Sequence, residues 1–222
     1  MTTLPITYKD GHLFLELEDG LWLFDTGAPT SFGESKEIAL DGHRSPMSNS
    51  YMGLSASSLS EFTGVGCRGL LGADILGRFD HILDVRGATA TISTGELEHP
   101  GRTLALSEFM GIPILAARIA GTDHQMFFDS GAQISYFQED SITDFPSAGS
   151  VTDFFPGVGQ FQTDTHQVSV RLADIDFTLR CGTLPGLLGA TLMMADVSGI
   201  IGNQLFLDRI IGYFPRRGIL SL

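Results

Sequence analysis

Two short stretches of this sequence share one pattern: Leu23-Phe24-Asp25-Thr26-Gly27-Ala28 and Phe127-Phe128-Asp129-Ser130-Gly131-Ala132. In each stretch, two hydrophobic residues precede an aspartate, and a hydroxyl residue, a glycine and an alanine follow it. The two aspartates are 104 positions apart, which is close to half of the 222-residue chain. One Asp-Thr-Gly is weak evidence, because Asp and Gly are common in turns. A second copy half a chain later predicts an internal duplication.

A second pair of matching motifs follows the aspartates in the same order. Leu70-Leu71-Gly72 and Ile200-Ile201-Gly202 each precede a short helical pattern and then an apolar hairpin that ends the half. Gly186-Leu187-Leu188-Gly189 also resembles this motif, but only the later copy is followed by the same ending as in the first half. The aspartate and the motif glycine are 47 positions apart in the first half and 73 in the second. The second half therefore contains an insertion of about 26 residues.

The composition favours a turn-rich β protein. Hydrophobic residues make up 43% of the chain and charged residues 18%, so a sizeable core can be buried. Asp10-Gly11 and Asp19-Gly20 lie between apolar runs, which predicts hairpins, because glycine adopts a positive φ without a Cβ clash. Residues Ser55–Phe62 predict a short helix with a serine cap. We expect an all-β fold with a few short helices, in an N-terminal lobe (residues 1–98) and a C-terminal lobe (residues 99–222).

Charge and composition argue against several classes of function. The formal net charge of −13 disfavours nucleic acid and anionic membrane surfaces as partners, because both need basic patches. We see no signal peptide and no run of ~18 apolar residues, and we therefore expect a cytoplasmic protein. We expect Cys67 and Cys181 to be buried free thiols and Trp22 to be a core residue. The six histidines lack metal-ligand spacing, so we expect them at the surface or in turns, with no metal or cofactor bound.

The duplication has a chemical consequence for the two aspartates. Two halves with the same pattern are expected to pair about a pseudo-twofold axis, as in a dimer fused into one chain. If the axis passes between the two turns, the carboxyl groups of Asp25 and Asp129 meet. Two carboxylates in contact share one proton, so one can act as a general base towards water while the other acts as a general acid.

At this point the sequence resembles the aspartic proteases of the retropepsin and pepsin superfamily. The resemblance rests on the two aspartate loops, with Thr30-Ser31 and Ile134-Ser135-Tyr136 after them, and on the two hydrophobic-hydrophobic-Gly motifs. Retropepsins carry one such unit and dimerise, whereas pepsins fuse two in a much longer chain. This chain is most similar to compact, single-chain, bacterial-type relatives. The resemblance implies a bilobal, pseudo-twofold acid-protease fold of the double-psi β-barrel type, and an endopeptidase that acts on peptide or protein substrates as a monomer.

The resemblance also implies roles for individual residues. Asp25 and Asp129 would be the catalytic dyad. The hydroxyl residues after them would hydrogen-bond across the axis, and the glycines would let the backbone approach and donate N–H groups to the carboxylates. The alanines replace a Ser or Thr of many acid-acting pepsins, which removes a hydrogen bond to the ionised aspartate and predicts a weakly acidic to near-neutral pH optimum. The residues expected to support the dyad are Thr26, Gly27, Ala28, Ser130, Gly131 and Ala132.

Enzymes of this superfamily cover the substrate with a β-hairpin flap. The candidate flap in the first half, residues 43–52, is indistinct, whereas residues 153–161 in the second half are aromatic with a glycine-rich tip. We therefore expect the second-half segment to cover the cleft. Its candidate substrate-binding residues are Phe154, Phe155, Gly157, Gly159 and Phe161.

Other interpretations of the same residues remain open at this point. In one interpretation, the two aspartates are only turn residues that end strands. In another, the fold is correct but the protein binds peptides without cleaving them. Paired carboxylates also serve carbohydrate hydrolases, although the Gly-Ala context resembles the protease loop. Residues 64–69 fit the dinucleotide pattern G-x-G-x-x-G, but they precede a strand-like run and not a long helix, so a glycine-rich turn is the better interpretation.

Overall fold

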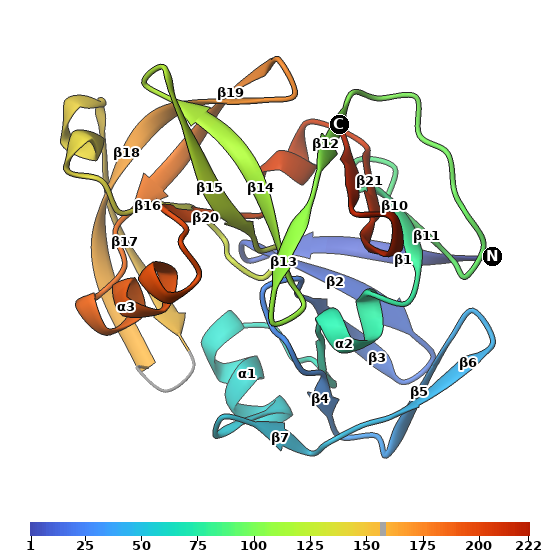
Figure 1. Ribbon diagram of the computed structural model, residues 1–222. Helices are drawn as coiled ribbons and strands as arrows, with labels where there is room; N and C mark the ends of the chain where they lie inside the picture. Colours follow the sequence, from blue (N-terminus) through green and yellow to red (C-terminus); the bar gives the residue numbers. More distant parts are fainter. Residues whose placement is uncertain (156–158) are drawn as a thin grey trace.

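The computed structural model describes residues 1–155 and 159–222, and most of the regular structure in this part of the chain is β-strand (Figure 1). The predicted all-β class is therefore confirmed. The strands of the first half are β1 (Thr2–Lys9), β2 (His12–Leu17), β3 (Gly20–Phe24), β4 (Phe32–Gly33), β5 (Glu37–Leu40), β6 (His43–Pro46), β7 (Ser50–Tyr51), β8 (Leu54–Ser55), β9 (Gly69–Leu71), β10 (Asp80–Asp84) and β11 (Thr89–Ser93).

The second half contributes the remaining strands and most of the helical turns. Its strands are β12 (Thr103–Ala105), β13 (Ser107–Phe109), β14 (Ile112–Ile119), β15 (Thr122–Phe128), β16 (Ser135–Phe137), β17 (Ser147–Phe155), β18 (Gly159–Leu172), β19 (Ile175–Gly182), β20 (Gly199–Ile201), β21 (Ile211–Phe214) and β22 (Ile219–Ser221). The helices of the whole described chain are α1 (Ala56–Thr63), α2 (Ala73–Leu76), α3 (Gly186–Met194) and the 3-10 turns η1 (Asp140–Asp144), η2 (Asn203–Leu207) and η3 (Pro215–Arg217).

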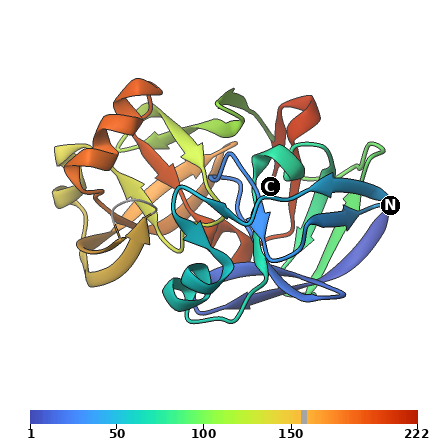
Figure 2. The same cartoon turned by 90° about the horizontal axis from the view of Figure 1, so that it is seen from below.

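Two large sheets organise the described residues. One has the strand order β12-β22-β21-β10-β11-β1-β2-β3-β9-β4, and the other has the order β13-β14-β15-β20-β16-β19-β18-β17. The first sheet takes β12, β21 and β22 from the second half of the sequence, so it continues across the lobe boundary predicted at residue 98. Figure 2 shows the yellow and orange elements of the second half on the left and most blue and teal elements of the first half on the right.

The two halves repeat one strand register around the aspartates. Strand β3 pairs in parallel with β9, and Phe24 lies opposite Leu71. Strand β15 pairs in parallel with β20 in the same way, and Phe128 lies opposite Ile201. The strands after the aspartate loops, β4 and β16, add to β9 and β20 in antiparallel fashion. Each hydrophobic-hydrophobic-Gly motif thus lies directly beside the strand that ends at an aspartate.

Several local expectations are confirmed by the structure. Ser55 caps α1, and its backbone N–H and hydroxyl exchange hydrogen bonds with Ser58. The motif at residues 199–202 forms β20, whereas Gly186 begins α3. Trp22 and both cysteines are buried. Residues 64–69 connect the left-handed C-cap of α1 to β9, which is the arrangement of a turn and not of a dinucleotide site.

The expected surface placement of the histidines is wrong for His12 and His81, which are 3% and 0% exposed. The His81 ring stacks on Tyr213, and its Nε2 lies 2.8 Å from the carbonyl oxygen of Leu76. Burial lowers the pKa of His81 to about 4, so the ring is neutral and packs as an aromatic core residue.

A buried ionic cluster joins the two halves of the chain. Asp80, at the start of β10, has no exposed side-chain surface, and its carboxylate accepts hydrogen bonds from Arg216 at 2.9 Å and Arg217 at 2.5 Å. The backbone N–H of Leu97 donates to the same carboxylate at 3.0 Å. The carboxylate therefore holds η3 and the segment after β11 against β10.

We predict that Asp80→Ala destabilises the protein by about 3–5 kcal/mol, because removing one partner leaves two partly buried guanidinium groups without their anion. Chemical denaturation in urea measures this loss. Asp208→Ala is the matched control, since it removes an ion pair with Arg86 in which both side chains are exposed, and its cost is expected to stay below about 1 kcal/mol. Equal losses in the two variants would contradict a special role for Asp80.

Candidate active site

Each aspartate lies where a strand ends beside its supporting motif. The backbone N–H of Asp25, after β3, donates to the carbonyl oxygen of Leu71 at 3.0 Å. The N–H of Asp129, after β15, donates to the carbonyl oxygen of Ile201 at 3.0 Å. Both aspartates are half-buried. The parallel pairing therefore continues to the aspartates themselves and fixes where each carboxyl group begins.

Each aspartate loop turns its backbone N–H groups towards its own carboxyl group. Asp25 Oδ1 accepts hydrogen bonds from the N–H groups of Gly27 at 2.9 Å and Ala28 at 3.0 Å. Asp129 Oδ1 accepts the equivalent bonds from Gly131 at 2.9 Å and Ala132 at 3.2 Å. Hydrogen bonds of this kind stabilise the charged form of a carboxyl group.

Thr26 and Ser130 interlock the two loops. The Thr26 hydroxyl donates to the carbonyl oxygen of Phe128 at 2.7 Å and accepts from the N–H of Ser130 at 3.0 Å. The Ser130 hydroxyl donates to the carbonyl oxygen of Phe24 at 2.9 Å and accepts from the N–H of Thr26 at 3.0 Å. Both side chains are fully buried, and both hydroxyl groups donate and accept. The arrangement is reciprocal, so neither loop can shift without breaking bonds to the other.

The glycines of the loops are required by the contact between the halves. A methyl group at Gly27 would overlap the carboxyl group of Asp129, and a methyl group at Gly131 would overlap the carboxyl group of Asp25. Each carboxyl group thus lies against the backbone of the opposite loop. Only a residue without Cβ permits this approach.

The two carboxyl groups lie close enough for each to affect the ionisation of the other. Burial raises the pKa of Asp25 well above its usual value, and the charge of Asp129 raises it further. Burial also raises the pKa of Asp129, and its hydrogen bonds from Asp25 and the loop oppose that rise. The pair therefore holds one proton between two carboxyl oxygens over a range of pH in which isolated aspartates are ionised.

Two serines connect the loops to the supporting motifs. The Ser31 hydroxyl accepts from the N–H of Gly72 at 2.8 Å and donates to Asp74 at 2.6 Å. The hydroxyl of Ser135 accepts from the N–H of Gly202 at 3.0 Å. These serines are part of the stretches on which the resemblance was based, and the structure places them in equivalent positions.

The predicted flap segment belongs to the β17–β18 hairpin of the second half. Phe155 and Phe161 pack against the apolar cluster of the second half, whereas Phe154 packs against the cluster of the first half. The Phe154 ring stacks on Phe62 of α1, with ring centroids 4.8 Å apart. Gly159 begins β18, and Gly157 lies outside the described residues. The hairpin therefore bridges the two halves through Phe154.

The sequence alone assigned no role to Tyr136, Asp153 or His12, which lie near the second aspartate loop. Tyr136 donates its hydroxyl hydrogen to the carboxylate of Asp153, and both side chains are buried. His12 Nδ1 lies 3.1 Å from the carbonyl oxygen of Gly131. The only sequence signal for His12 is its position directly after the Asp10-Gly11 turn, and the pattern of one hairpin does not reveal what its tip contacts.

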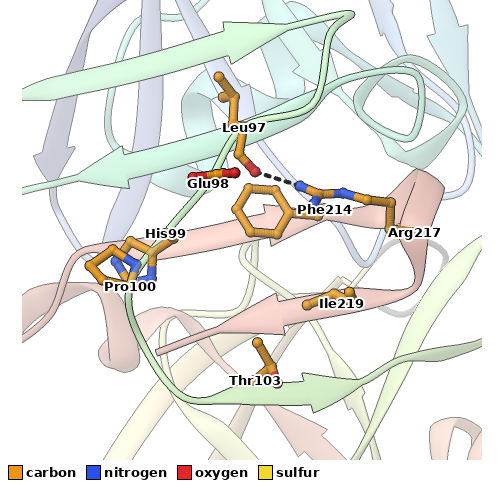
Figure 3. Close-up of a pocket in the computed structure, with 8 residues that line it drawn as sticks. All are labelled: Leu97, Glu98, His99, Pro100, Thr103, Phe214, Arg217 and Ile219. Atoms are coloured by element: carbon orange, nitrogen blue, oxygen red, sulfur yellow. Dashed lines mark hydrogen bonds between the residues drawn. The ribbon is translucent and has the colours of Figure 1, made fainter.

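Two cavities lie away from the dyad. One, of about 490 Å³, is lined by residues that include His99, Phe214 and Arg217. Figure 3 shows the Arg217 guanidinium hydrogen-bonded to the carbonyl group of Leu97 in this cavity. The other, of about 330 Å³, lies between α2 and the β13–β14 turn. Among the described residues that line them, neither cavity includes an aspartate of the pair.

The described residues contain no group of three or more His, Cys, Asp or Glu side chains placed to hold a metal ion. None of the helices in this part of the chain has the length and apolar character that a membrane span needs. No protein-family model matches the chain, and a search of curated proteins finds no match.

The raised pKa values predict a pH-dependent effect of Asp25→Asn on stability. Above pH ~4 the unfolded aspartates lose their protons while the folded pair retains one, so the folded state binds more protons and its stability falls as pH rises. Asn carries no charge at any of these pH values, so Asp25→Asn removes this fall in stability with pH. The Tm gain of Asp25→Asn over wild type should therefore grow from pH 4 to pH 7, by about 2–4 °C for each kcal/mol in a chain of this size.

Thermal unfolding at both pH values measures this difference. Asp176→Asn is the control, because the hydrogen bond from Arg171 lowers the pKa of Asp176, whereas the pKa of Asp25 is raised. The Tm of Asp176→Asn relative to wild type should therefore not rise between pH 4 and pH 7. A Tm difference for Asp25→Asn that stays flat or shrinks with pH would contradict the raised pKa of the pair.

Proposed function

We propose that this chain is an aspartic endopeptidase that hydrolyses peptide bonds with water activated between Asp25 and Asp129. The observation that carries the proposal is the interlocked pair of loops, in which Thr26 and Ser130 hold the two carboxyl groups close to each other. Paired carboxyl groups that share a proton are suited to general base and general acid catalysis at one centre.

In the proposed mechanism, the ionised carboxylate removes a proton from a water molecule, and the resulting oxygen nucleophile attacks the carbonyl carbon of the scissile peptide. The protonated carboxyl group donates its proton to the carbonyl oxygen, which gives a neutral tetrahedral diol. The carboxyl group that took the proton from water then passes it to the leaving nitrogen. The C–N bond breaks as one hydroxyl of the diol returns its proton to the dyad, which gives the carboxylic acid and the amine products. The dyad ends with one proton, as it began, and the mechanism needs no metal or cofactor.

We further propose that the fold is the pseudo-twofold, double-psi type of the acid proteases, complete in one chain. The repeated parallel pairing of β3 with β9 and of β15 with β20 supports this, as do the equivalent bonds of Ser31 and Ser135. Both halves supply one loop each, so a single copy of the chain suffices for the site.

The β17–β18 hairpin is proposed to cover the substrate. Phe154 reaches from this hairpin to Phe62 in the other half, which supports a position above the region between the halves. An extended peptide would be recognised by backbone hydrogen bonds along a strand edge and by alternate side chains in pockets.

A second candidate is a peptide-binding module on the same fold that cleaves nothing. It differs from the enzyme in one measurable respect, since it binds peptides and leaves them intact. The shared proton favours the enzyme, because a binding surface gains nothing from two carboxyl groups placed in contact.

We predict that a mixed peptide library is cleaved between pH 3 and pH 8, with an optimum at weakly acidic to near-neutral pH, as read by mass spectrometry. Asp25→Asn and Asp129→Asn should each lower kcat/KM by at least about 10³-fold. Each variant retains only one carboxyl group, which cannot be the general base and the general acid in the same step. Asp208→Asn, at an exposed position, should retain activity.

A statine-type inhibitor, which resembles the tetrahedral intermediate, should block the cleavage. Bound but intact peptides at every pH would favour the binding module. Cleavage that survives either aspartate substitution would overturn the proposed mechanism.

We predict that Phe154→Ala raises KM about 5- to 50-fold and lowers kcat less, because it removes the aromatic contact that holds the hairpin across the two halves. Phe161→Ala should act in the same direction. Phe177→Ala is the control, because Phe177 lies opposite Val170, towards the other end of β18. Steady-state kinetics on one cleaved peptide measure all three, and unchanged constants for both Phe154→Ala and Phe161→Ala would exclude the hairpin as the flap.

A further inference from the structure

The two peptide groups that hold Asp129 are themselves held by side chains. The N–H of Gly131 belongs to the same peptide group as the carbonyl of Ser130, and the N–H of Ala132 belongs to that of Gly131. Both N–H groups donate to Asp129 Oδ1. A hydrogen-bond donor on either carbonyl oxygen is therefore connected to the Asp129 carboxylate through one planar peptide group.

Asn203 and His12 supply these donors. Asn203 Nδ2 donates to the carbonyl oxygen of Ser130 at 3.3 Å and to that of Gly11 at 2.8 Å. Two carbonyl oxygens face this amide group, so the NH₂ end must point towards them. His12 Nδ1 lies 3.1 Å from the carbonyl oxygen of Gly131, which requires the hydrogen on Nδ1. Both side chains are buried, at 0% and 3% exposed.

The tip of the β1–β2 hairpin is shaped to bring His12 to this loop. Gly11 has a φ of +84°, and a Cβ at this position would lie 2.9 Å from the side-chain oxygen of Gln133. Glycine therefore satisfies both the backbone conformation and the close approach. The hairpin of the first half thus packs directly on the aspartate loop of the second half.

The first loop has no such support in the described part of the chain. Ala73 follows Gly72 where Asn203 follows Gly202, and alanine has no donor. The N–H groups of Gly27 and Ala28 donate to Asp25, but no described side chain donates to the carbonyl oxygens of Thr26 and Gly27. The two halves therefore differ at the one place where their carboxyl groups are held.

We propose that His12 and Asn203 are positioning residues that make Asp129 the ionised member of the pair and leave the proton on Asp25. A donor on a carbonyl oxygen polarises the N–H of the same peptide group and strengthens the bond that this N–H makes. Among the described residues, side chains give this reinforcement to Asp129 and not to Asp25. The inference rests on the proposed function for its catalytic meaning: Asp129 is the general base towards water and Asp25 the general acid.

Other charged groups lie near His12 and Asp129. Asp153 and Asp10 act on His12, and Asp153 also acts on Asp129 with a charge that opposes ionisation. Tyr136 and the N–H of Phe154 both donate to Asp153 and spread its charge. For Asp129, the bonds from Asp25, Gly131 and Ala132 outweigh the effect of Asp153.

The experiment is an NMR titration of protein labelled with ¹³C at the aspartate carboxyl carbons, with Asp25→Asn and Asp129→Asn to assign the two signals. In the wild type, the Asp129 carbon should report ionisation at a lower pH than the Asp25 carbon. In His12→Phe, which keeps a ring and removes the donor, the Asp129 transition should move up by about 0.5 pH unit. His12→Asn, which restores a donor near the Nδ1 position, should stay close to the wild type.

Ionisation of Asp25 first in the wild type would overturn the inference, and so would an Asp129 transition that does not move in His12→Phe. If His12→Phe does not fold, the order of the two transitions in the wild type still decides. The readout does not depend on cleavage. The expected order in a protein that cleaves no peptide would support the placement of the charge and overturn the proposed function, so the two failures are distinguishable.

Discussion

The reciprocal hydrogen bonds of Thr26 and Ser130 are the constraint on which the rest of the site depends. Two carboxyl groups in contact repel each other when both are ionised, and each loses hydration on burial. Without a rigid connection the loops would separate until water entered between them. The hydroxyl groups donate and accept across the contact, so the buried backbone groups of both loops are satisfied only when the loops are together. The glycines of the loops, and the parallel pairing of β3 with β9 and of β15 with β20, serve the same requirement.

Around this repeated centre the two halves differ in ways that matter for chemistry. Tyr136 occupies the position in β16 that Phe32 occupies in β4, and its hydroxyl reaches Asp153 of the β17–β18 hairpin. His12 and Asn203 support only the second loop. A symmetric pair of carboxyl groups has no preferred acid and no preferred base. The single-chain arrangement permits each half to vary separately, so the surroundings can fix which aspartate carries the proton.

The sequence alone was sufficient to predict what is repeated and local. The loops, the supporting motifs, the helix capped by Ser55 and the place of the insertion all follow from patterns that span adjacent residues. The strand pairing of the second half with β10, the burial of His12 and His81, and the role of Asn203 do not. Each depends on contacts between segments that are far apart in the sequence, such as that between His12 and Gly131. A single histidine or asparagine carries no periodic signal, and its meaning arises only when the hairpin tip packs on the loop.

Under the proposed function, the relative strengths of the contacts between the halves indicate which contact would give way first to a substrate. The shared sheet and the buried cluster of Asp80 with Arg216 and Arg217 hold the halves together, and breaking such a cluster costs several kcal/mol. The stack of Phe154 on Phe62 is an aromatic contact between partly buried rings, worth about 0.5–1.5 kcal/mol beyond its area. A peptide that needs room between α1 and the hairpin would therefore displace Phe154 before it separated the halves. The second loop is anchored independently of that stack, because His12 and Asn203 reach it from the first half and from η2.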